Sequence, residues 1–374
     1  MTGGSPRFLV VAWRDDEWQT VRGARWYLHG GERYRTLANE ALAPHGEVEH
    51  LSWDPNDEVE ERATALDARL PDADALVMSP WLLSDLPTFD ETRFGRAPSL
   101  RAIAGTFDFR LGWIDLDAAA RAGVRVIDTS RSMTWTVAEF GLGITLALLR
   151  DIPASIDVVR RGEWPDAPKG SGPFVFRDLA DCRVGLAGYG SINRSYRKLA
   201  APFGCEVSAC DPFLDDDTAA RDGIVRADSL VDLAARSDIL VVAIPPTPTT
   251  LGVIDAGVID ALPTGSLFVL VSRMAVVDQD ALWRRVRAGE LRAAVDVYDP
   301  EPPPADAWFR RSADVLPTPH IAGNVQFAHE RCFVEACADA VRAVRGEELR
   351  YPALDRDKRL YEGKLGAVAE RPTS

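Results

Sequence analysis

The sequence lacks an excess of basic charge, and this absence excludes two classes of partner. Its 43 Lys and Arg residues stand against 57 Asp and Glu residues, so the net charge is −14 at pH 7. A surface of that sign repels phosphate backbones and anionic lipids. We expect no apolar stretch long enough to cross a bilayer, and the start, MTGGSPRFLVVAW, shows no signal-peptide pattern. The sequence therefore predicts a cytoplasmic protein that binds neither nucleic acid nor membrane.

Cysteine is also scarce. The five cysteines have no C-x-x-C spacing, which argues against metal ligands and a disulfide framework; they are Cys182, Cys205, Cys210, Cys332 and Cys337. We expect buried free thiols and no metal site. With 374 residues, of which 46% are hydrophobic and 27% charged, the chain is long enough for two globular domains.

Apolar runs and helical patterns alternate along the chain in two series. Five strand-like runs fall within residues 7–129 (RFLVVAW, EVEHLSW, ALVMS, LRAIAGTF and VRVIDT), and five more within residues 182–298 (CRVGLAG, EVSACD, DILVVAIP, SLFVLVS and AAVDVY). The second series has only weak period-2 alternation, as is typical of parallel strands buried on both faces. This pattern predicts an α/β fold with two separate sheets.

Two long helical patterns predict where the chain passes between domains. Residues 136–164 have the pattern of one long, mostly apolar helix, and a second long helix follows the last strand from residue 325. If these helices carry the chain out of the first domain and back, the second domain is inserted into the first. We predict residues 1–131 plus 327–374 for one domain and residues 132–326 for the other.

The segment GLAGYGSINRSYRKLAAPFG, residues 185–204, has the pattern of a dinucleotide-binding turn with one glycine replaced. Gly188 allows a tight turn, and Gly190 lets the backbone approach a pyrophosphate at the N-terminus of the next helix. Asn193 stands where a third glycine serves helix packing. The alternative is a strand-turn-helix corner with incidental glycines. The predicted contacts in this turn are Gly188, Tyr189, Gly190, Ser191 and Ile192.

Asp211 ends the next predicted strand, about 20 residues past Gly190, where a carboxylate accepts hydrogen bonds from the adenosine ribose. A carboxylate repels a 2′-phosphate, so this residue favours NAD over NADP. The alternative is that Asp211 only opens a turn before Pro212. Together with the glycine turn, it favours a nucleotide site.

Three further residues could handle a carbonyl and a proton beside such a cofactor. Arg273 directly follows a buried strand, and a guanidinium can bind a carboxylate with two parallel hydrogen bonds. Glu301 lies in a proline-rich loop, and His320 lies between a proline and a short apolar run. Taken singly, the alternatives are a surface ion pair, a solvated acid and a structural histidine.

Together these residues lie in motifs that resemble one family from about residue 100 to residue 330. The chain is similar to the D-isomer-specific 2-hydroxyacid dehydrogenases in the stretches IDLDAAARAGVRVIDT, VAEFGLGITLALLR, RRGEW, VGLAGYGSI, PPTPTTLGVI, SRMAVVDQDAL, AAVDVYDPEP and TPHIAG. The resemblance implies a Rossmann NAD-binding domain, residues 132–326, inserted into a flavodoxin-like substrate domain. It also implies a homodimer formed with the apolar helix at residues 136–150.

By this resemblance the enzyme interconverts a 2-oxo acid and its D-2-hydroxy acid in the cleft between the domains. His320 is the general acid and base, Glu301 holds its imidazole in the protonated form, and Arg273 orients the substrate. Asp296 binds the nicotinamide carboxamide, although a strand-end aspartate satisfied by backbone N–H groups is the alternative. The remaining cofactor contacts that we predict are Pro246, Ser272 and Gly323.

Several departures from the family pattern leave the substrate open. Arg110, followed by Leu111, occupies a loop that is usually glycine-rich; it either adds a cation to the substrate pocket or faces solvent. Met274 replaces a glycine and is expected to crowd the turn after Arg273. The loop at residues 80–82 carries no cation, so we expect an apolar pocket and no dedicated phosphate site. Residues 14–35 form a long aromatic segment that is a lid, a subunit contact or a surface loop.

Two other functions stay open at this stage. A binding module that senses NAD without turnover would keep the same fold, although Arg273, Glu301 and His320 argue against it. Formate dehydrogenases of the same superfamily pair their histidine with glutamine, so Glu301 counts against that branch. Oxidation of a phosphite or phosphonate remains an alternative reaction.

Overall fold

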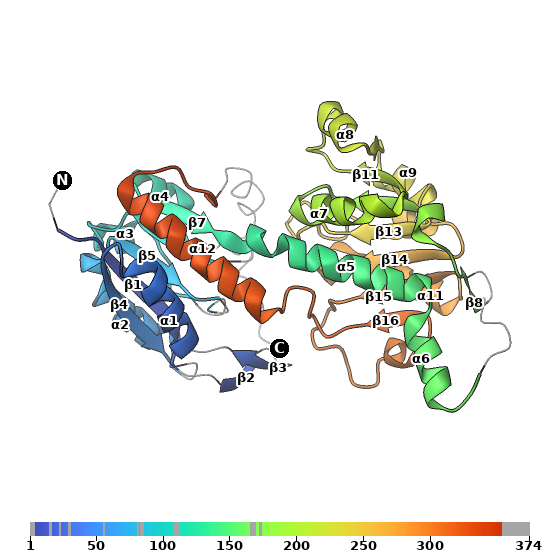
Figure 1. Cartoon of the computed structure of the whole chain (residues 1–374), viewed down its shortest axis with the longest axis horizontal. Coiled ribbons are helices and arrows are strands. Elements are labelled where there is room, and N and C mark those ends of the chain that lie inside the picture. The colour runs from blue at the N-terminus through green and yellow to red at the C-terminus, as the bar shows by residue number, and fades with distance from the viewer. Residues whose placement is uncertain are drawn as a thin grey trace. The chain divides into compact units, whose positions relative to one another are not determined.

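The chain folds into two compact units, drawn in Figure 1. This computed structural model describes residues 4–14, 17–21, 24–28, 31–54, 57–80, 82, 86–107, 113–164, 170–171 and 174–353. The first unit comprises Met1–Met133 and Val325–Ser374, and the second, Thr134–Asn324, is inserted between those segments. Each unit has a parallel sheet with helices on both faces. The predicted α/β class with two doubly wound sheets is confirmed.

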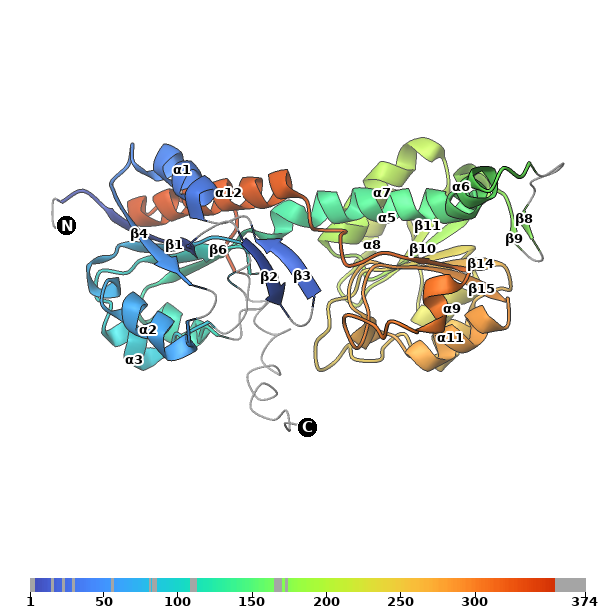
Figure 2. The ribbon, with the colours of Figure 1, turned by 90° about the horizontal axis from the view of Figure 1, so that it is seen from below.

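The first unit has five parallel strands in the order β4-β1-β5-β6-β7. The winding reverses at β1, as in flavodoxin-like sheets. Helices α1 and α12 cover one face, and α2, α3 and α4 cover the other (Figure 2). The elements are β1 (Arg7–Trp13), α1 (Gly31–Leu42), β4 (Glu47–Trp53), α2 (Val59–Asp67), η1 (Leu70–Asp72), β5 (Ala75–Met78), α3 (Glu91–Gly95), β6 (Ala102–Gly105), α4 (Leu116–Arg121), β7 (Arg125–Asp128), η2 (Thr129–Met133) and α12 (Gln326–Arg345).

The second unit has seven parallel strands in the order β12-β11-β10-β13-β14-β15-β16. Helices α5 and α7 pack on one face, and α9, α10 and α11 on the other. The elements are α5 (Thr134–Leu149), α6 (Ile152–Arg160), η3 (Leu179–Asp181), β10 (Arg183–Ala187), α7 (Ser191–Ala200), η4 (Ala201–Phe203), β11 (Glu206–Cys210), α8 (Asp216–Asp222), β12 (Val225–Arg226), α9 (Leu230–Ala235), β13 (Ile239–Val242), α10 (Ala256–Ala261), β14 (Ser266–Leu270), η5 (Met274–Val276), α11 (Gln279–Arg287), β15 (Leu291–Val295), η6 (Trp308–Arg311) and β16 (Val315–Pro317).

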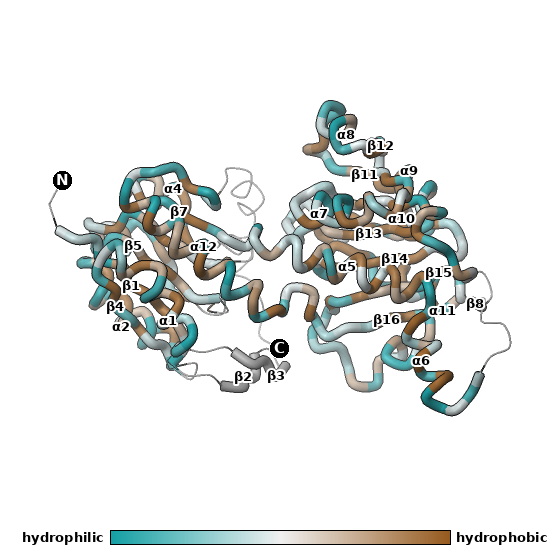
Figure 3. Tube along the Cα trace, viewed as in Figure 1, coloured by the Kyte–Doolittle hydropathy of each residue, from teal (hydrophilic) through white to brown (hydrophobic). Residues whose placement is uncertain are grey.

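The central strands of the second unit are buried along their whole length. Every residue of β13, β14 and β15 is buried, and Figure 3 shows these strands as mainly hydrophobic. This is the packing that continuous apolar runs predict for parallel strands. The strands that our sequence analysis did not predict are short: β12 and β16, and two antiparallel pairs, β2 (Glu17–Val21) with β3 (Ala24–Leu28) and β8 (Gly170–Ser171) with β9 (Phe174–Val175).

The single long helix predicted for residues 136–164 is wrong. The chain instead forms α5 and α6, which are separated at Asp151, whose φ of 51° is in the left-handed region. Pro153 then occupies the first turn of α6, where a missing N–H group is tolerated. The apolar pattern continues across the break because both helices carry apolar residues, and periodicity alone does not show the change of direction.

The expectation that no apolar stretch reaches membrane-spanning length is also wrong, when a segment is judged by its length and composition alone. Among the described residues, one helical segment, Thr129–Leu149, passes that test, and 39% of its most apolar window is buried. Its buried side packs in the core of the second unit, including Leu142 and Leu148.

Candidate active site

His320 and Glu301 form a hydrogen-bonded pair at the carboxyl edge of the second unit's sheet. His320 follows β16, and Glu301 lies in the loop after β15. The Nδ1 atom of His320 is 2.5 Å from the Oε1 atom of Glu301. Because an ionised carboxylate only accepts hydrogen bonds, Nδ1 donates, and Nε2 is the ring nitrogen that can exchange a proton elsewhere. The two side chains are 26% and 29% exposed, so a small molecule can reach them.

Glu301 is held in its ionised form. Burial opposes ionisation of its carboxyl group, but the hydrogen bond from His320 and the positive charges of His320 and Arg273 outweigh that effect. The pKa of Glu301 therefore lies below its ordinary value. The ionised carboxylate accepts from Nδ1 and so holds the imidazole in one orientation, as a general acid requires.

The backbone of His320 is held in an unusual conformation by Asp296. His320 has a φ of 55°, in the left-handed region that non-glycine residues seldom adopt. Asp296, which is fully buried, accepts hydrogen bonds from the Thr318 hydroxyl at 2.6 Å, the Ile321 N–H at 2.9 Å and the Ala322 N–H at 2.8 Å. These donors flank His320 on both sides. They use three of about four lone-pair positions, so the predicted contact with the nicotinamide carboxamide stays a prediction.

Tyr298 and Thr318 support the same segment, and our sequence analysis did not predict roles for them. The Tyr298 hydroxyl lies 3.1 Å from the Val295 carbonyl oxygen and 3.0 Å from that of Thr318. It therefore connects the end of β15 with the residues that precede His320. Both residues lie inside the motifs DVY and TPH, but a motif does not show which backbone groups its side chains reach.

Arg273 lies at the same sheet edge, after β14. Its Nη1 atom donates to the Ser272 carbonyl oxygen at 2.7 Å, and its charge acts on Glu301. The structure thus brings Arg273, Glu301 and His320 together. Met274, which we expected to crowd the turn, is instead buried in the core cluster under α10 and α11. The replacement of glycine by methionine is therefore accommodated by the core.

The glycine turn lies at the carboxyl end of β10, on the same edge of the same sheet. Gly188 has a φ of 79°, which favours glycine. A Cβ atom on Gly190 would meet no atom within 4 Å, so the space beside this residue is open for a ligand. Ser191 and Ile192 begin α7, and Gly190 precedes them without a side-chain cap. The first N–H groups of α7 are thus available to a pyrophosphate.

Asp211 lies at the end of β11, next to this turn. Its Oδ2 atom accepts from the Tyr189 N–H at 2.6 Å, and its Oδ1 atom accepts from the Phe213 N–H at 2.7 Å. The carboxylate is only partly buried, and each oxygen keeps a lone pair for a further donor. The turn, the open space at Gly190 and this carboxylate fit the pyrophosphate and ribose of a dinucleotide.

The other predicted site residues divide into two groups. Pro246 follows β13, Ser272 follows β14, and Gly323 follows His320, all at the carboxyl edge of the same sheet. Ser272 is 7% exposed. Arg110 and Leu111 lie outside the described residues, so their predicted contact with substrate stays a prediction.

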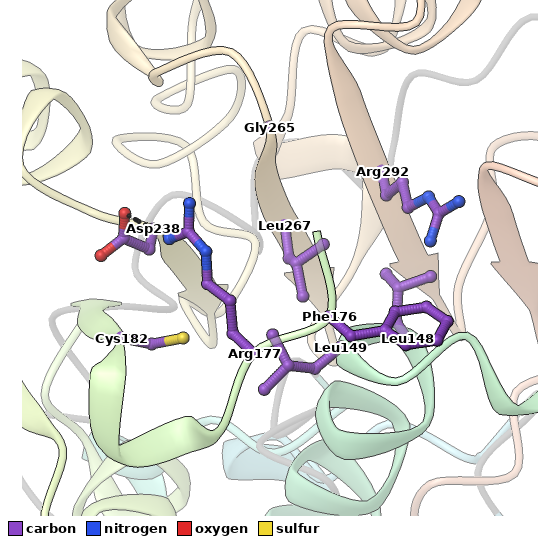
Figure 4. A pocket seen from close by; sticks show the side chains of 9 residues that line it. All are labelled: Leu148, Leu149, Phe176, Arg177, Cys182, Asp238, Gly265, Leu267 and Arg292. Carbon is purple, nitrogen blue, oxygen red and sulfur yellow. Dashed lines mark hydrogen bonds and ion pairs between the residues drawn. The ribbon is translucent and has the colours of Figure 1, made fainter. Parts of the chain in front are cut away.

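A small cavity at the opposite edge of this sheet is not part of the site (Figure 4). It holds about 20 Å³, which is room for one water molecule. Cys182 lines it beside the ion pair of Arg177 and Asp238. Burial and the negative charge of Asp238 raise the pKa of the Cys182 thiol to about 11, so this thiol is a poor nucleophile.

Comparisons with known proteins agree with this geometry. Residues 142–322 match the family model described as "D-isomer specific 2-hydroxyacid dehydrogenase, NAD binding domain". The (S)-sulfolactate dehydrogenase of Chromohalobacter salexigens is 31% identical over 243 residues, which cover 65% of this chain and 77% of that protein. The chain belongs to the D-isomer-specific 2-hydroxyacid dehydrogenase family. The cofactor of the matched domain is NAD.

Two further comparisons match over different lengths. The D-3-phosphoglycerate dehydrogenase of Mycobacterium bovis is 32% identical over 281 residues, 75% of this chain but 51% of that protein. The chain thus spans about half the length of such relatives. A solved phosphoglycerate oxidoreductase from Rhizobium etli superposes with a TM-score of 0.73 at 24% identity and covers 94% of this chain and 99% of its own. That likeness supports the fold alone.

Proposed function

We propose that this chain is an NAD-dependent oxidoreductase that interconverts a 2-oxo acid and its D-2-hydroxy acid. The observation that carries the proposal is the 2.5 Å pair of His320 and Glu301, on the sheet edge that also holds the glycine turn and Asp211. An imidazole oriented by a carboxylate is a common proton donor and acceptor in general acid–base catalysis. A histidine with only a structural role would not require a partly exposed carboxylate as its hydrogen-bond partner, so the pair favours a catalytic role.

Each residue then has a defined part in the reaction. When bound, NAD takes up the hydride during oxidation and NADH supplies it during reduction. His320 donates a proton from Nε2 to the carbonyl oxygen of the 2-oxo acid, and in the reverse direction the same atom accepts the proton from the hydroxyl group. Glu301 accepts from Nδ1 and so fixes which ring nitrogen faces the substrate. Arg273 binds the substrate carboxylate.

We further propose a substrate without a phosphate group. The relatives named above act on a phosphorylated and a sulfonated acid by their names. In this chain Pro80 and Leu82, which follow β5, are buried and uncharged, and Leu82 packs in a core cluster. These two positions therefore supply no cation for a phosphate.

The test is a panel of 2-oxo acids with NADH and, separately, NADPH. The acids carry apolar, carboxylate, sulfonate or phosphate ends. We expect consumption of NADH, little use of NADPH because of Asp211, and a preference for an end without phosphate. If NADH binds but no acid on the panel is reduced, the chain is an NAD-binding module without turnover.

His320→Ala provides the residue-level test of the same proposal. Loss of a general acid slows proton transfer roughly a hundredfold or more, so kcat should fall by that factor while the affinity for NADH is kept. NADH affinity is measured by fluorescence titration. Unchanged turnover in this variant would contradict the assignment of His320.

The homodimer and the cytoplasmic location also belong to this proposal, but we place the dimer interface on α6 and not on the helix at residues 136–150 that the resemblance implied. None of the residues of α6, all of which the structure describes, is buried, and Ile152, Ile156 and Val159 are 43–55% exposed. An apolar row of this kind is typical of a subunit interface. A reducing compartment preserves free thiols, and all five cysteines are free.

A further inference from the structure

Asn193, which replaces the third glycine of the cofactor turn, is fully buried and in contact with three carbonyl groups. Its Nδ2 atom donates to the Gly188 oxygen at 2.6 Å and to the Ala187 oxygen at 3.1 Å, and lies 3.5 Å from that of Val241. Its Oδ1 atom has no hydrogen-bond partner within the part of the chain that the structure describes. The opposite amide orientation would place this oxygen against three acceptors, so the carbonyl groups fix the orientation.

The contact with Gly188 also constrains the neighbouring residue. The Gly188 carbonyl and the Tyr189 N–H belong to one planar peptide unit. Asn193 binds the oxygen of this unit at 2.6 Å, and the Asp211 Oδ2 atom accepts from its nitrogen at 2.6 Å. The same peptide plane is therefore held at both ends. Rotation of this plane would break both hydrogen bonds.

We propose that Asn193 is a positioning residue that acts on the cofactor through this peptide. By fixing the Gly188–Tyr189 plane, it fixes the N–H group that orients the Asp211 carboxylate toward the ribose. Asparagine at this position therefore contributes to cofactor binding and is not only a tolerated replacement of glycine. The inference rests on the NAD site of the proposed function and does not depend on which acid is reduced.

The central test restores glycine with Asn193→Gly. In a plain dinucleotide turn, glycine at this position lets the helix approach the strand, so restored or improved binding is the opposing expectation. Here the loss of the hydrogen bond should weaken NADH binding about five- to tenfold. It should also reduce the preference for NADH over NADPH, because Asp211 loses part of its support. Both affinities are measured by fluorescence titration.

A double-mutant cycle separates positioning from general damage. If Asn193 acts through Asp211, Asn193→Gly should change NADH affinity less than about twofold in an Asp211→Ala background. Tyr196→Phe is the matched control, because Tyr196 is buried in the same helix and its hydroxyl bonds to Thr145 at 3.1 Å, away from the turn. This control should lower the free energy of unfolding and leave NADH affinity unchanged.

A second readout needs no cofactor. In the unliganded protein the Tyr189 amide should exchange its hydrogen at least about tenfold faster in Asn193→Gly than in the wild type, and at the wild-type rate in Tyr196→Phe. Additive effects in the cycle, or unchanged Tyr189 exchange, would overturn the proposal. NADH that binds no form of the protein would overturn the cofactor site together with this inference. NADH that binds without turnover would overturn only the proposed reaction.

Discussion

His320 meets two requirements at once: its imidazole must reach Glu301, and its backbone must adopt a left-handed conformation. That conformation costs a non-glycine residue about 1–2 kcal/mol. The three hydrogen bonds that Asp296 accepts around His320 offset this cost. The side chain is therefore positioned by a buried carboxylate that binds the residues on either side of it.

The pKa of Glu301 gives a prediction for acid stability. Its value in the folded protein is lowered, so its contribution to stability is present above the unfolded pKa, near 4.5, and is lost as pH falls through the lower folded value. Glu301→Gln should therefore lower the free energy of unfolding at pH 6, and the difference from wild type should shrink below about pH 4.5. At neutral pH its kcat should fall about tenfold or more. Urea unfolding and steady-state kinetics measure the two effects.

A matched exposed acid serves as the control. Glu163 is paired with Arg161, whose hydrogen bond lowers its pKa, but both side chains are more than half exposed. Exposed pairs contribute little to stability, so Glu163→Gln should change neither property measurably. A stability difference at Glu301 that persists unchanged to pH 3.5 would contradict the proposed linkage.

Only those site residues that lie in recognisable sequence motifs were predictable. Arg273, Glu301 and His320 stand in recognisable stretches after buried strands, so their meeting at one sheet edge follows from the parallel topology. The Asn193 contacts were not predictable. In the sequence, asparagine at this position reads only as the absence of the third glycine of the motif. Its bonds depend on carbonyl groups from β10, from the turn after β10 and from β13, and a sequence does not show how these converge.

At the scale of elements, α5 and α7 pack closely where α5 has a glycine. A Cβ atom on Gly141 would lie 3.5 Å from Val271 and 3.6 Å from Tyr196, which is ordinary contact distance. The bounds of α5 also show the limits of periodicity. The apolar pattern predicted a helix but not the break at Asp151 between α5 and α6, because left-handed backbone at a non-glycine residue leaves little trace in composition.

Two glycine substitutions in the second unit should have opposite effects. Gly141→Ala should raise the free energy of unfolding by about 0.5–1 kcal/mol, since alanine is the better helix former and meets no clash. Gly185→Ala, in β10, should lower it by roughly 1–3 kcal/mol, because the new Cβ atom would lie 2.0 Å from the Ser237 hydroxyl oxygen. Urea unfolding measures both. Equal effects of the two substitutions would contradict this account of the packing.

At the scale of the whole molecule, the exposed row on α6 predicts the oligomeric state. Ile156→Arg places a charge in the middle of that row, so the proposed dimer should dissociate, as light scattering after size-exclusion chromatography would show. Val231→Arg is the control, because Val231 on α9 is similarly exposed, at 47% against 43% for Ile156. A dimer that survives the first substitution, or is lost with the second, would place the interface elsewhere.

The interruption of the first unit by the second has a consequence for biosynthesis. Phe333, Ala336 and Cys337 on α12 belong to the core on one face of the first unit's sheet. The last strand of that sheet, β7, ends at Asp128. A ribosome adding about 5–20 residues per second makes the whole of Thr134–Asn324 before it reaches that helix. The part of this face that α12 covers, beside α1, is thus left exposed for roughly ten to forty seconds. The second unit, although it is encoded after the strands of the first, can therefore fold before the first unit is complete.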